Sequence, residues 1–463
     1  MTSQPLLAAD RASLNAERGP VNMNVGAVLT FEAGPGLEYA SMFERLSSRL
    51  HLVPRFRQRL EESSSGLANP VWIDDPHFDL AWHLRSGYLP APGTDNELGT
   101  YVAAEASRRM DRTRPLWELH IINGLADGKV AIFCKLHHAM VDGIAALAIG
   151  TLILDPTPEP LVIEAPEGGA WVPQGYNRSE HLARMARAPL RKAEELVLQI
   201  NTRAIYTRPH AAASDLRKAG KLATELARSR PQAPMTPLNR PITPNRCFAM
   251  EHLPLAAVKA FAKLGDATVN DALLAAVAGM LRRYLDETDE MPDSDPVALV
   301  PVSVRAGGDD GGNQISTVFV DLPCAEDDPI QRLRIVAERT RELKSSAAVK
   351  AGALMVEATG FAPPLVSTMI GKAMGGVRAF NVVVSNVPGP QFPLYIGGSQ
   401  MEAIYPVVPL NPANQGLTVG MLSYNGTVCI GLLADGNLTP GLDRAAVALR
   451  ASLSEIVELS TAT

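Results

Sequence analysis

The segment KLHHAMVDGIAAL, residues 135–147, carries side chains that can perform acid–base chemistry. His137 and His138 are adjacent, and Asp142 and Gly143 follow after three further residues. A histidine has an ordinary pKa of about 6.5, so it can act as a general base near neutral pH. An apolar run ends at the histidines, and Asp142 is well placed as the N-cap of a following helix. The pair is therefore predicted at a strand end or in the turn after it.

The two histidines are expected to have different tasks. Side chains of neighbouring residues in an extended backbone point to opposite faces, so one imidazole should face the chemistry while the other supports it. Metal binding is disfavoured, because paired ligands normally share a face and adjacent residues do not. Two histidines that only form hydrogen bonds in the core are the structural alternative. The nearby Asp142 and Gly143 favour the chemical interpretation.

The sequence indicates direct rather than covalent catalysis. It contains neither a Gly-x-Ser-x-Gly elbow nor a cysteine–histidine arrangement, so no acyl-enzyme is predicted. The simplest remaining reaction is one in which a histidine removes the proton of an acceptor hydroxyl. That hydroxyl then attacks an acyl carbonyl.

The composition is that of a globular protein with more than one domain. A chain of 463 residues exceeds the size at which one hydrophobic core stops growing, which is about 250 to 300 residues. The formal charge of -6 disfavours nucleic acid as a partner. The four cysteines have no short metal-binding or redox spacing and are expected to be reduced. The first residues lack the apolar run of a signal peptide, so a cytoplasmic protein is expected.

Strand-like and helix-like segments alternate, which predicts an α/β fold. We expect one domain over residues 1–155, a linker over 156–245 and a second domain over 246–463. Between residues 175 and 231 the linker has twelve Lys/Arg and five Asp/Glu, and its pattern is mostly helical. It is either a solvated helical connector or a segment attracted to an anionic lipid surface. Charged residues and two prolines interrupt the apolar segment 353–374, so no spanning helix is predicted there.

Several motifs give the chain a family resemblance. Residues 137–143 match HHxxxDG, which is shared by chloramphenicol-acetyltransferase-like acyltransferases and nonribosomal condensation domains. Four further motifs follow the order of one family: PLW at 115–117, ND at 270–271, PVSVR at 301–305 and NVVVSNVPGP at 381–390. With these motifs nearly the whole chain resembles the bacterial wax ester synthase/diacylglycerol acyltransferase family.

The resemblance implies two chloramphenicol-acetyltransferase-like domains, each a mixed β-sheet with packed helices, with a tunnel at their interface. It implies acyl-CoA as co-substrate and donor, a long-chain alcohol or diacylglycerol as acceptor, and no metal or other cofactor. It also implies that His138 is the catalytic base and that His137 and Asp142 hold its loop. Because such acceptors reside in lipid, we expect peripheral association with a membrane or lipid inclusion.

Other motif residues keep two interpretations each. Trp117 is either a core residue or a residue that shapes the site. Asn270 is either a helix cap or a supporting site residue. Arg305 either pairs with a carboxylate such as Asp142 or binds a CoA phosphate. Ser385 either forms a tight turn or lies near the base.

The tetrahedral intermediate needs hydrogen-bond donors. The candidates are the Gly143 backbone N–H, the Asn270 amide and Ser385. Two other functions remain open: acyl transfer to a different alcohol or amine, and a non-catalytic protein bound to a lipid surface.

Overall fold

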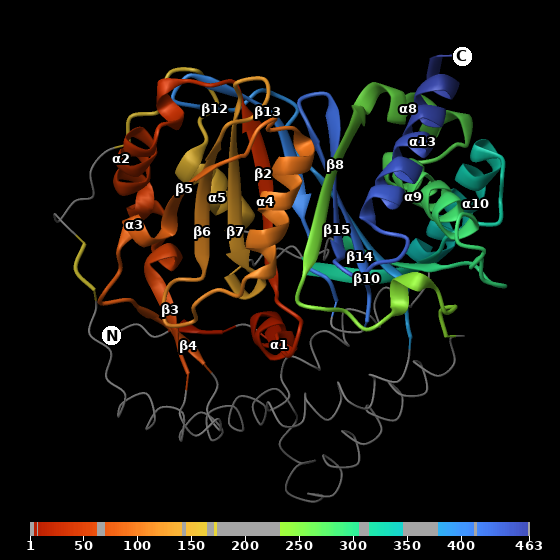
Figure 1. Ribbon diagram of the computed structural model, residues 1–463, viewed down its shortest axis with the longest axis horizontal. Helices are drawn as coiled ribbons and strands as arrows, with labels where there is room; N and C mark the ends of the chain where they lie inside the picture. Colours follow the sequence, from red (N-terminus) through yellow and green to blue (C-terminus); the bar gives the residue numbers. More distant parts are fainter. Residues whose placement is uncertain are drawn as a thin grey trace, which may run out of the picture.

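The computed structural model describes residues 4–6, 8–62, 70–140, 145–163, 171–173, 232–304, 314–345, 378–411 and 414–461. Two six-stranded sheets covered by helices lie side by side and define two lobes (Figure 1). The N-lobe contains the sheet built around residues 24–137, and the C-lobe contains the sheet built around residues 246–435. The expected basic segment 175–231 and the apolar segment 353–374 lie outside the described residues.

The N-lobe sheet has the strand order β12-β13-β2-β7-β6-β5, in which only β5 and β6 are parallel. Its strands are β2 (Asn24–Phe31), β5 (Leu84–Tyr88), β6 (Trp117–Asn123), β7 (Val130–His137), β12 (Tyr395–Ile396) and β13 (Ser399–Val407). A small second sheet contains β1 (Gln4–Pro5), β4 (Val71–Asp74) and β3 (Gln58–Glu61). The helices are α1 (Ala8–Ala16), α2 (Tyr39–Arg49), α3 (Leu80–His83), α4 (Asp95–Ser107) and α5 (Ala145–Ile153).

The C-lobe sheet has the strand order β10-β9-β11-β14-β15-β8 and is also mixed, because β11 runs parallel to both β9 and β14. Its strands are β8 (Arg246–Pro254), β9 (Val297–Val304), β10 (Gln314–Asp321), β11 (Val382–Pro388), β14 (Leu417–Tyr424) and β15 (Thr427–Asp435). Its helices are α8 (Leu255–Leu264), α9 (Val269–Asp286), α10 (Pro329–Ser345) and α13 (Leu442–Thr461). The predicted α/β class with two mixed sheets is confirmed.

Two strands from the later part of the chain complete the N-lobe sheet. β13 pairs with β2 from Met401 to Val407, and β12 continues the sheet beyond β13 (Figure 1). A division of the chain at residue 245 therefore does not separate the two sheets. The alternating burial at the start of β13 is typical of a strand, but the sheet that it joins depends on long-range pairing.

The two lobes pack closely at glycines, which have no side chain to keep the backbones apart. A Cβ added to Gly99 on α4 would lie 2.4 Å from the Phe248 carbonyl oxygen of β8. A Cβ added to Gly431 on β15 would lie 2.0 Å from the carbonyl oxygen of Pro406 on β13. Each glycine thus allows a backbone approach that any side chain would block. A shared core of buried residues, including Val102, lies between the lobes.

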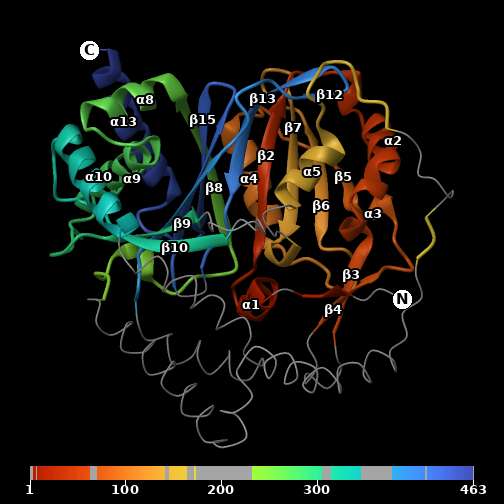
Figure 2. The same cartoon turned by 180° about the vertical axis from the view of Figure 1, so that it is seen from behind.

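Helices cover the apolar faces of both sheets. All eight residues of β7 are buried, because α5 lies on one face of the N-lobe sheet and α4 on the other (Figure 2). In the C-lobe, α8, α9 and α13 pack on one face of the sheet. Among the described helices, no single one is long and apolar enough to cross a membrane; α8 and α9 reach that limit only together, across a 91° bend.

Candidate active site

The histidine pair lies where β7 ends, beside α1 (Figure 1). The amide of His137 donates to the Leu116 carbonyl at 3.0 Å, and the amide of His138 donates to the Met23 carbonyl at 2.8 Å. β7 ends at His137, and a 3₁₀ turn begins at His138. The expectation of opposite faces was therefore wrong in its premise, because the alternation of a strand does not continue into the turn. Both imidazoles instead meet the segment that contains α1.

His137 is fully buried, and both of its ring nitrogens face protein groups. The amide of Ala139 donates to His137 Nδ1 at 3.0 Å, so Nδ1 must be the unprotonated nitrogen. The neutral ring then carries its proton on Nε2, which lies 3.5 Å from Glu17 Oε2. At this distance and angle the contact is electrostatic rather than a hydrogen bond. His137 is thus held at both nitrogens.

Glu17 connects the histidine pair to the rest of the N-lobe. Its carboxylate accepts a hydrogen bond from Arg112 at 2.8 Å and one from the Met23 amide at 3.2 Å. Burial opposes ionisation of Glu17, but its contact with His137, then the hydrogen bonds from Arg112 and the Met23 amide, lower its pKa to about 2. Glu17 is therefore ionised in the folded protein at neutral pH.

We expect a Glu17→Gln substitution to destabilise the protein by roughly 2 to 3 kcal/mol at pH 7, from a pKa lowered from 4.5 to about 2. A lowered carboxylate pKa stabilises the fold above the unfolded-state value, and this contribution disappears as the pH falls through the folded-state value. The deficit of the variant should therefore shrink between pH 4.5 and pH 2. Urea unfolding of both proteins across this range measures it; a deficit that does not change with pH would contradict the assignment.

His138 is partly exposed, and one of its ring nitrogens, Nδ1, contacts another residue. Its Nδ1 lies 3.2 Å from Ser13 Oγ on α1. Among the described residues, its Nε2 makes no hydrogen bond. Burial, and next the neighbouring His137, lower the pKa of His138 below its usual value of 6.5. The ring is therefore neutral at physiological pH and can accept a proton.

Trp117 belongs to the core of the N-lobe. It is 1% exposed, stacks on His83 with ring centroids 4.4 Å apart, and donates from Nε1 to the Phe56 carbonyl at 2.8 Å. Indole has a single N–H donor, and that donor is occupied. The core interpretation of Trp117 therefore holds, and a part in shaping the site stays a prediction.

The ND and SNVPGP motifs meet in the C-lobe. Asn386 on β11 donates to Asn270 Oδ1 at 3.2 Å, across 116 residues of sequence. Asp271 is a helix cap: it forms a capping box with Thr268 and accepts from Thr340 at 2.7 Å. Ser385, next to Asn386 on β11, is half-buried. Asn270 is thus hydrogen-bonded to β11, the strand that contains Ser385, and Asp271 stabilises the first turn of α9.

Three predicted site residues, Asp142, Gly143 and Arg305, lie outside the described residues, so their roles remain predictions. The structure also shows contacts that the sequence did not predict. Ser13 and Glu17 reach the histidine pair from more than 100 residues away. A lone serine and a lone glutamate near a helix end carry no recognisable pattern.

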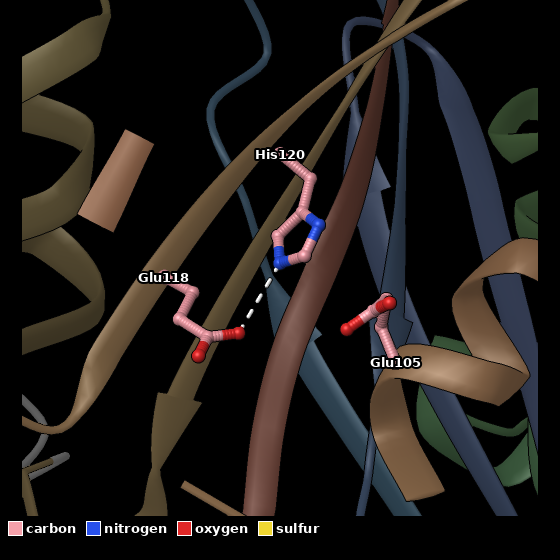
Figure 3. Close-up of side chains that lie close together, drawn as sticks. All are labelled: Glu105, Glu118 and His120. Carbon is pink, nitrogen blue, oxygen red and sulfur yellow. Dashed lines mark hydrogen bonds and ion pairs between the residues drawn. The ribbon is translucent and has the colours of Figure 1, made fainter. Parts of the chain in front are cut away.

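A partly buried ionic cluster lies between β6 and α4 and has the composition of a metal site. Figure 3 shows Glu118 and His120 of β6 facing Glu105 of α4, with ligand atoms within 4.8 Å of one another. Cations already neutralise these carboxylates. Lys135 contacts Glu118 at 3.4 Å. Two arginines also pair with them: Arg85 lies 3.2 Å from Glu118, and Arg108 lies 2.6 Å from Glu105.

The charged neighbours in this cluster explain the pKa of Glu118. Burial opposes ionisation of Glu118, yet His120, Lys135 and Arg85 together lower its pKa to about 2. His120 uses both nitrogens, with Nδ1 3.1 Å from Tyr101 Oη and Nε2 3.3 Å from Glu118. The cluster is thus a closed set of ion pairs that joins α4 to the sheet.

A cavity of about 540 Å³ lies between the lobes at the other end of β2. Thr30 lines it, and Thr30 is six residues along the strand from the partner of His137, a distance of roughly 20 Å. Its charged lining includes Asp95, Asp127 and Glu402 against Lys129, which already pairs with Glu402 at 2.9 Å. An anionic CoA head group does not suit this lining.

Comparison with known proteins identifies the class. The family model described as "Wax ester synthase/diacylglycerol acyltransferase catalytic domain" matches residues 6–273, and the "WS/DGAT C-terminal domain" matches residues 311–457. A Mycobacterium tuberculosis H37Rv protein named for diacylglycerol O-acyltransferase activity is 35% identical, covering 96% of this chain and 98% of its own length.

Two solved structures extend the comparison. The wax ester synthase/diacylglycerol acyltransferase from Marinobacter aquaeolei VT8 is 29% identical, with a TM-score of 0.71, and covers 99% of this chain and 100% of its own. The starter condensation domain of rhizomide synthetase shares the fold at 16% identity and a TM-score of 0.57. The match covers 99% of this chain and 95% of the condensation domain. Two mixed sheets with a histidine pair at a strand end thus define an acyltransferase of the condensation-domain fold. The chain belongs to the wax ester synthase/diacylglycerol acyltransferase family.

Proposed function

We propose that the protein transfers a long-chain acyl group from acyl-CoA to the hydroxyl of diacylglycerol, of a long-chain alcohol, or of both. The observation that carries the proposal is a neutral histidine, His138, at the end of β7 beside a second histidine whose nitrogens are both engaged. Family membership and the name of the mycobacterial relative support the acyl acceptor. No metal or redox cofactor takes part in the proposed reaction.

The geometry divides the work between the two histidines. His137 cannot accept a substrate proton on Nδ1, which is occupied by the Ala139 amide, and its Nε2 is protonated toward Glu17. His138 is neutral, and its Nε2 is the nitrogen left for substrate. His138 is therefore the base and His137 is part of its support.

The reaction then proceeds in two bond changes. His138 Nε2 takes the proton of the acceptor hydroxyl while the hydroxyl oxygen bonds to the thioester carbonyl carbon. The tetrahedral intermediate collapses by breaking the carbon–sulfur bond. The proton on His138 passes to the leaving CoA thiolate, so the base is regenerated. The products are the ester and free CoA.

The oxyanion of the intermediate needs donors. The Asn270 side chain suits this task, because its oxygen accepts from Asn386 and, within the part of the chain that the structure describes, its amide N–H groups make no hydrogen bond. Ser385 on the same strand and the Gly143 backbone N–H are the other candidates.

We also propose that the enzyme binds a lipid surface peripherally, since its acceptors are lipids. The excess of Lys/Arg over residues 175–231 supports an electrostatic contribution. Sedimentation with anionic vesicles at low and high salt tests this, and binding that does not respond to salt would exclude the contribution.

Product analysis tests the acceptor. Palmitoyl-CoA is supplied with equal amounts of diacylglycerol and hexadecanol, and the esters are separated and quantified. Triacylglycerol, wax ester or a mixture is expected. Release of CoA only with other alcohols or amines would support a different acceptor, and no release with any acceptor would support a non-catalytic lipid-surface protein.

A further inference from the structure

Ser13 lies against the catalytic turn. It is on α1, which packs against the turn that begins at His138, and it is 8% exposed. Its Oγ is 3.2 Å from His138 Nδ1. The amide of His138 donates to the Met23 carbonyl at 2.8 Å, which fixes the backbone that carries the ring.

The direction of the Ser13 hydrogen bond determines where the proton of the imidazole lies. If the serine hydroxyl donates to Nδ1, the neutral ring carries its proton on Nε2 and cannot accept one there. If Nδ1 donates to the serine oxygen, the lone pair of Nε2 is available.

The proposed reaction requires the second direction. His138 can take the alcohol proton on Nε2 only when its own ring proton lies on Nδ1. A serine hydroxyl accepts as well as donates, so Ser13 Oγ, 3.2 Å from Nδ1, can accept that proton.

We propose that Ser13 is a positioning residue, whose oxygen accepts the Nδ1–H of His138 and so keeps the Nε2 lone pair directed at the acceptor alcohol. The proposal rests on the proposed function for the direction of this hydrogen bond and for its kinetic effect, and on the 3.2 Å contact for the partner. A histidine held in the wrong tautomer loses up to about 10⁴-fold in rate in the best-studied hydrolases. The His138 ring is partly exposed, so water can replace the serine oxygen, and we expect a smaller loss for Ser13→Ala, about 10-fold in kcat.

The experiment combines spectroscopy with kinetics. The ¹⁵N shifts of the His138 ring, assigned by comparison with His138→Gln, report the tautomer in the free enzyme. We expect the Nδ1–H form in the wild type and an increased share of the Nε2–H form in Ser13→Ala. Ser13→Thr retains the hydroxyl and should restore both the tautomer and most of kcat.

Ser452→Ala is the matched control, because this serine is 1% exposed on α13 and, among the described residues, its Oγ has no hydrogen-bond partner. It should change neither the ring shifts nor kcat. A wild-type ring with its proton on Nε2, or an unchanged tautomer in Ser13→Ala, would overturn the proposal. If His138→Gln released CoA at the wild-type rate, the proposed function would fail while the tautomer result would still stand.

Discussion

A His138→Ala variant should keep its fold and lose about 10²- to 10⁴-fold of the rate of CoA release with palmitoyl-CoA and diacylglycerol. His138 is the proposed base, and His137 cannot replace it, because His137 Nδ1 is bonded to the Ala139 amide and its Nε2 faces Glu17. Binding of both substrates should be largely retained, so the loss should appear in kcat.

The control for this variant is His77→Ala, since His77 is an exposed histidine that belongs to a different loop. Its CoA release should equal that of the wild type, and circular dichroism should be the same for all three proteins. A folded His138→Ala protein with wild-type turnover would contradict the mechanism.

The same histidine sets a pH dependence. Because burial lowers the pKa of His138, the base stays deprotonated at pH values below 6.5. The acidic limb of kcat/KM should therefore fall at a lower pH than for an ordinary histidine.

The second large effect is expected on stability, from Asp155→Asn. Asp155 is 0% exposed and accepts from Arg45 at 2.7 Å and from Arg49 at 2.5 Å. Burial opposes its ionisation, but hydrogen bonds from Arg49 and Arg45 lower its pKa overall. Neutralising one partner of a buried ion pair leaves the other charges uncompensated, which costs about 3 to 5 kcal/mol.

This loss should be seen as a lower urea midpoint at pH 7. Asp327→Asn is the comparison, because Asp327 pairs with Arg282 at the surface and its side chain is 80% exposed. Such exposed pairs contribute about 0 to 1 kcal/mol. Equal midpoints for the two variants would show that the Asp155 pairs are not needed for stability.

Local patterns were sufficient to predict most elements. Burial alternates at the start of β13 as it does in a strand, and polar residues that can cap a helix stand at the start of α9. The histidine pair at a strand end followed from the apolar run before it. These features depend on residues that are close in sequence, so a local sequence pattern can predict them.

Features that depend on distant residues were not predicted. Ser13 meets His138 across 125 positions, and Asn386 meets Asn270 across 116. The sequence also placed the two imidazoles on opposite faces, because it contained no sign that the backbone turns at His138. Strand patterns identified β13 without indicating its partner, since pairing depends on the three-dimensional arrangement.

The pairing of β2 with β13 has a consequence for biosynthesis. One edge of β2 receives its partner only after roughly 370 further residues have been translated, which takes about 20 to 70 s at ordinary ribosomal rates. Until then the nascent N-lobe exposes an unpaired strand edge, the kind of surface that recruits other chains into aggregates. Chaperone protection during synthesis should therefore matter more for this protein than for one whose first sheet closes within its own segment.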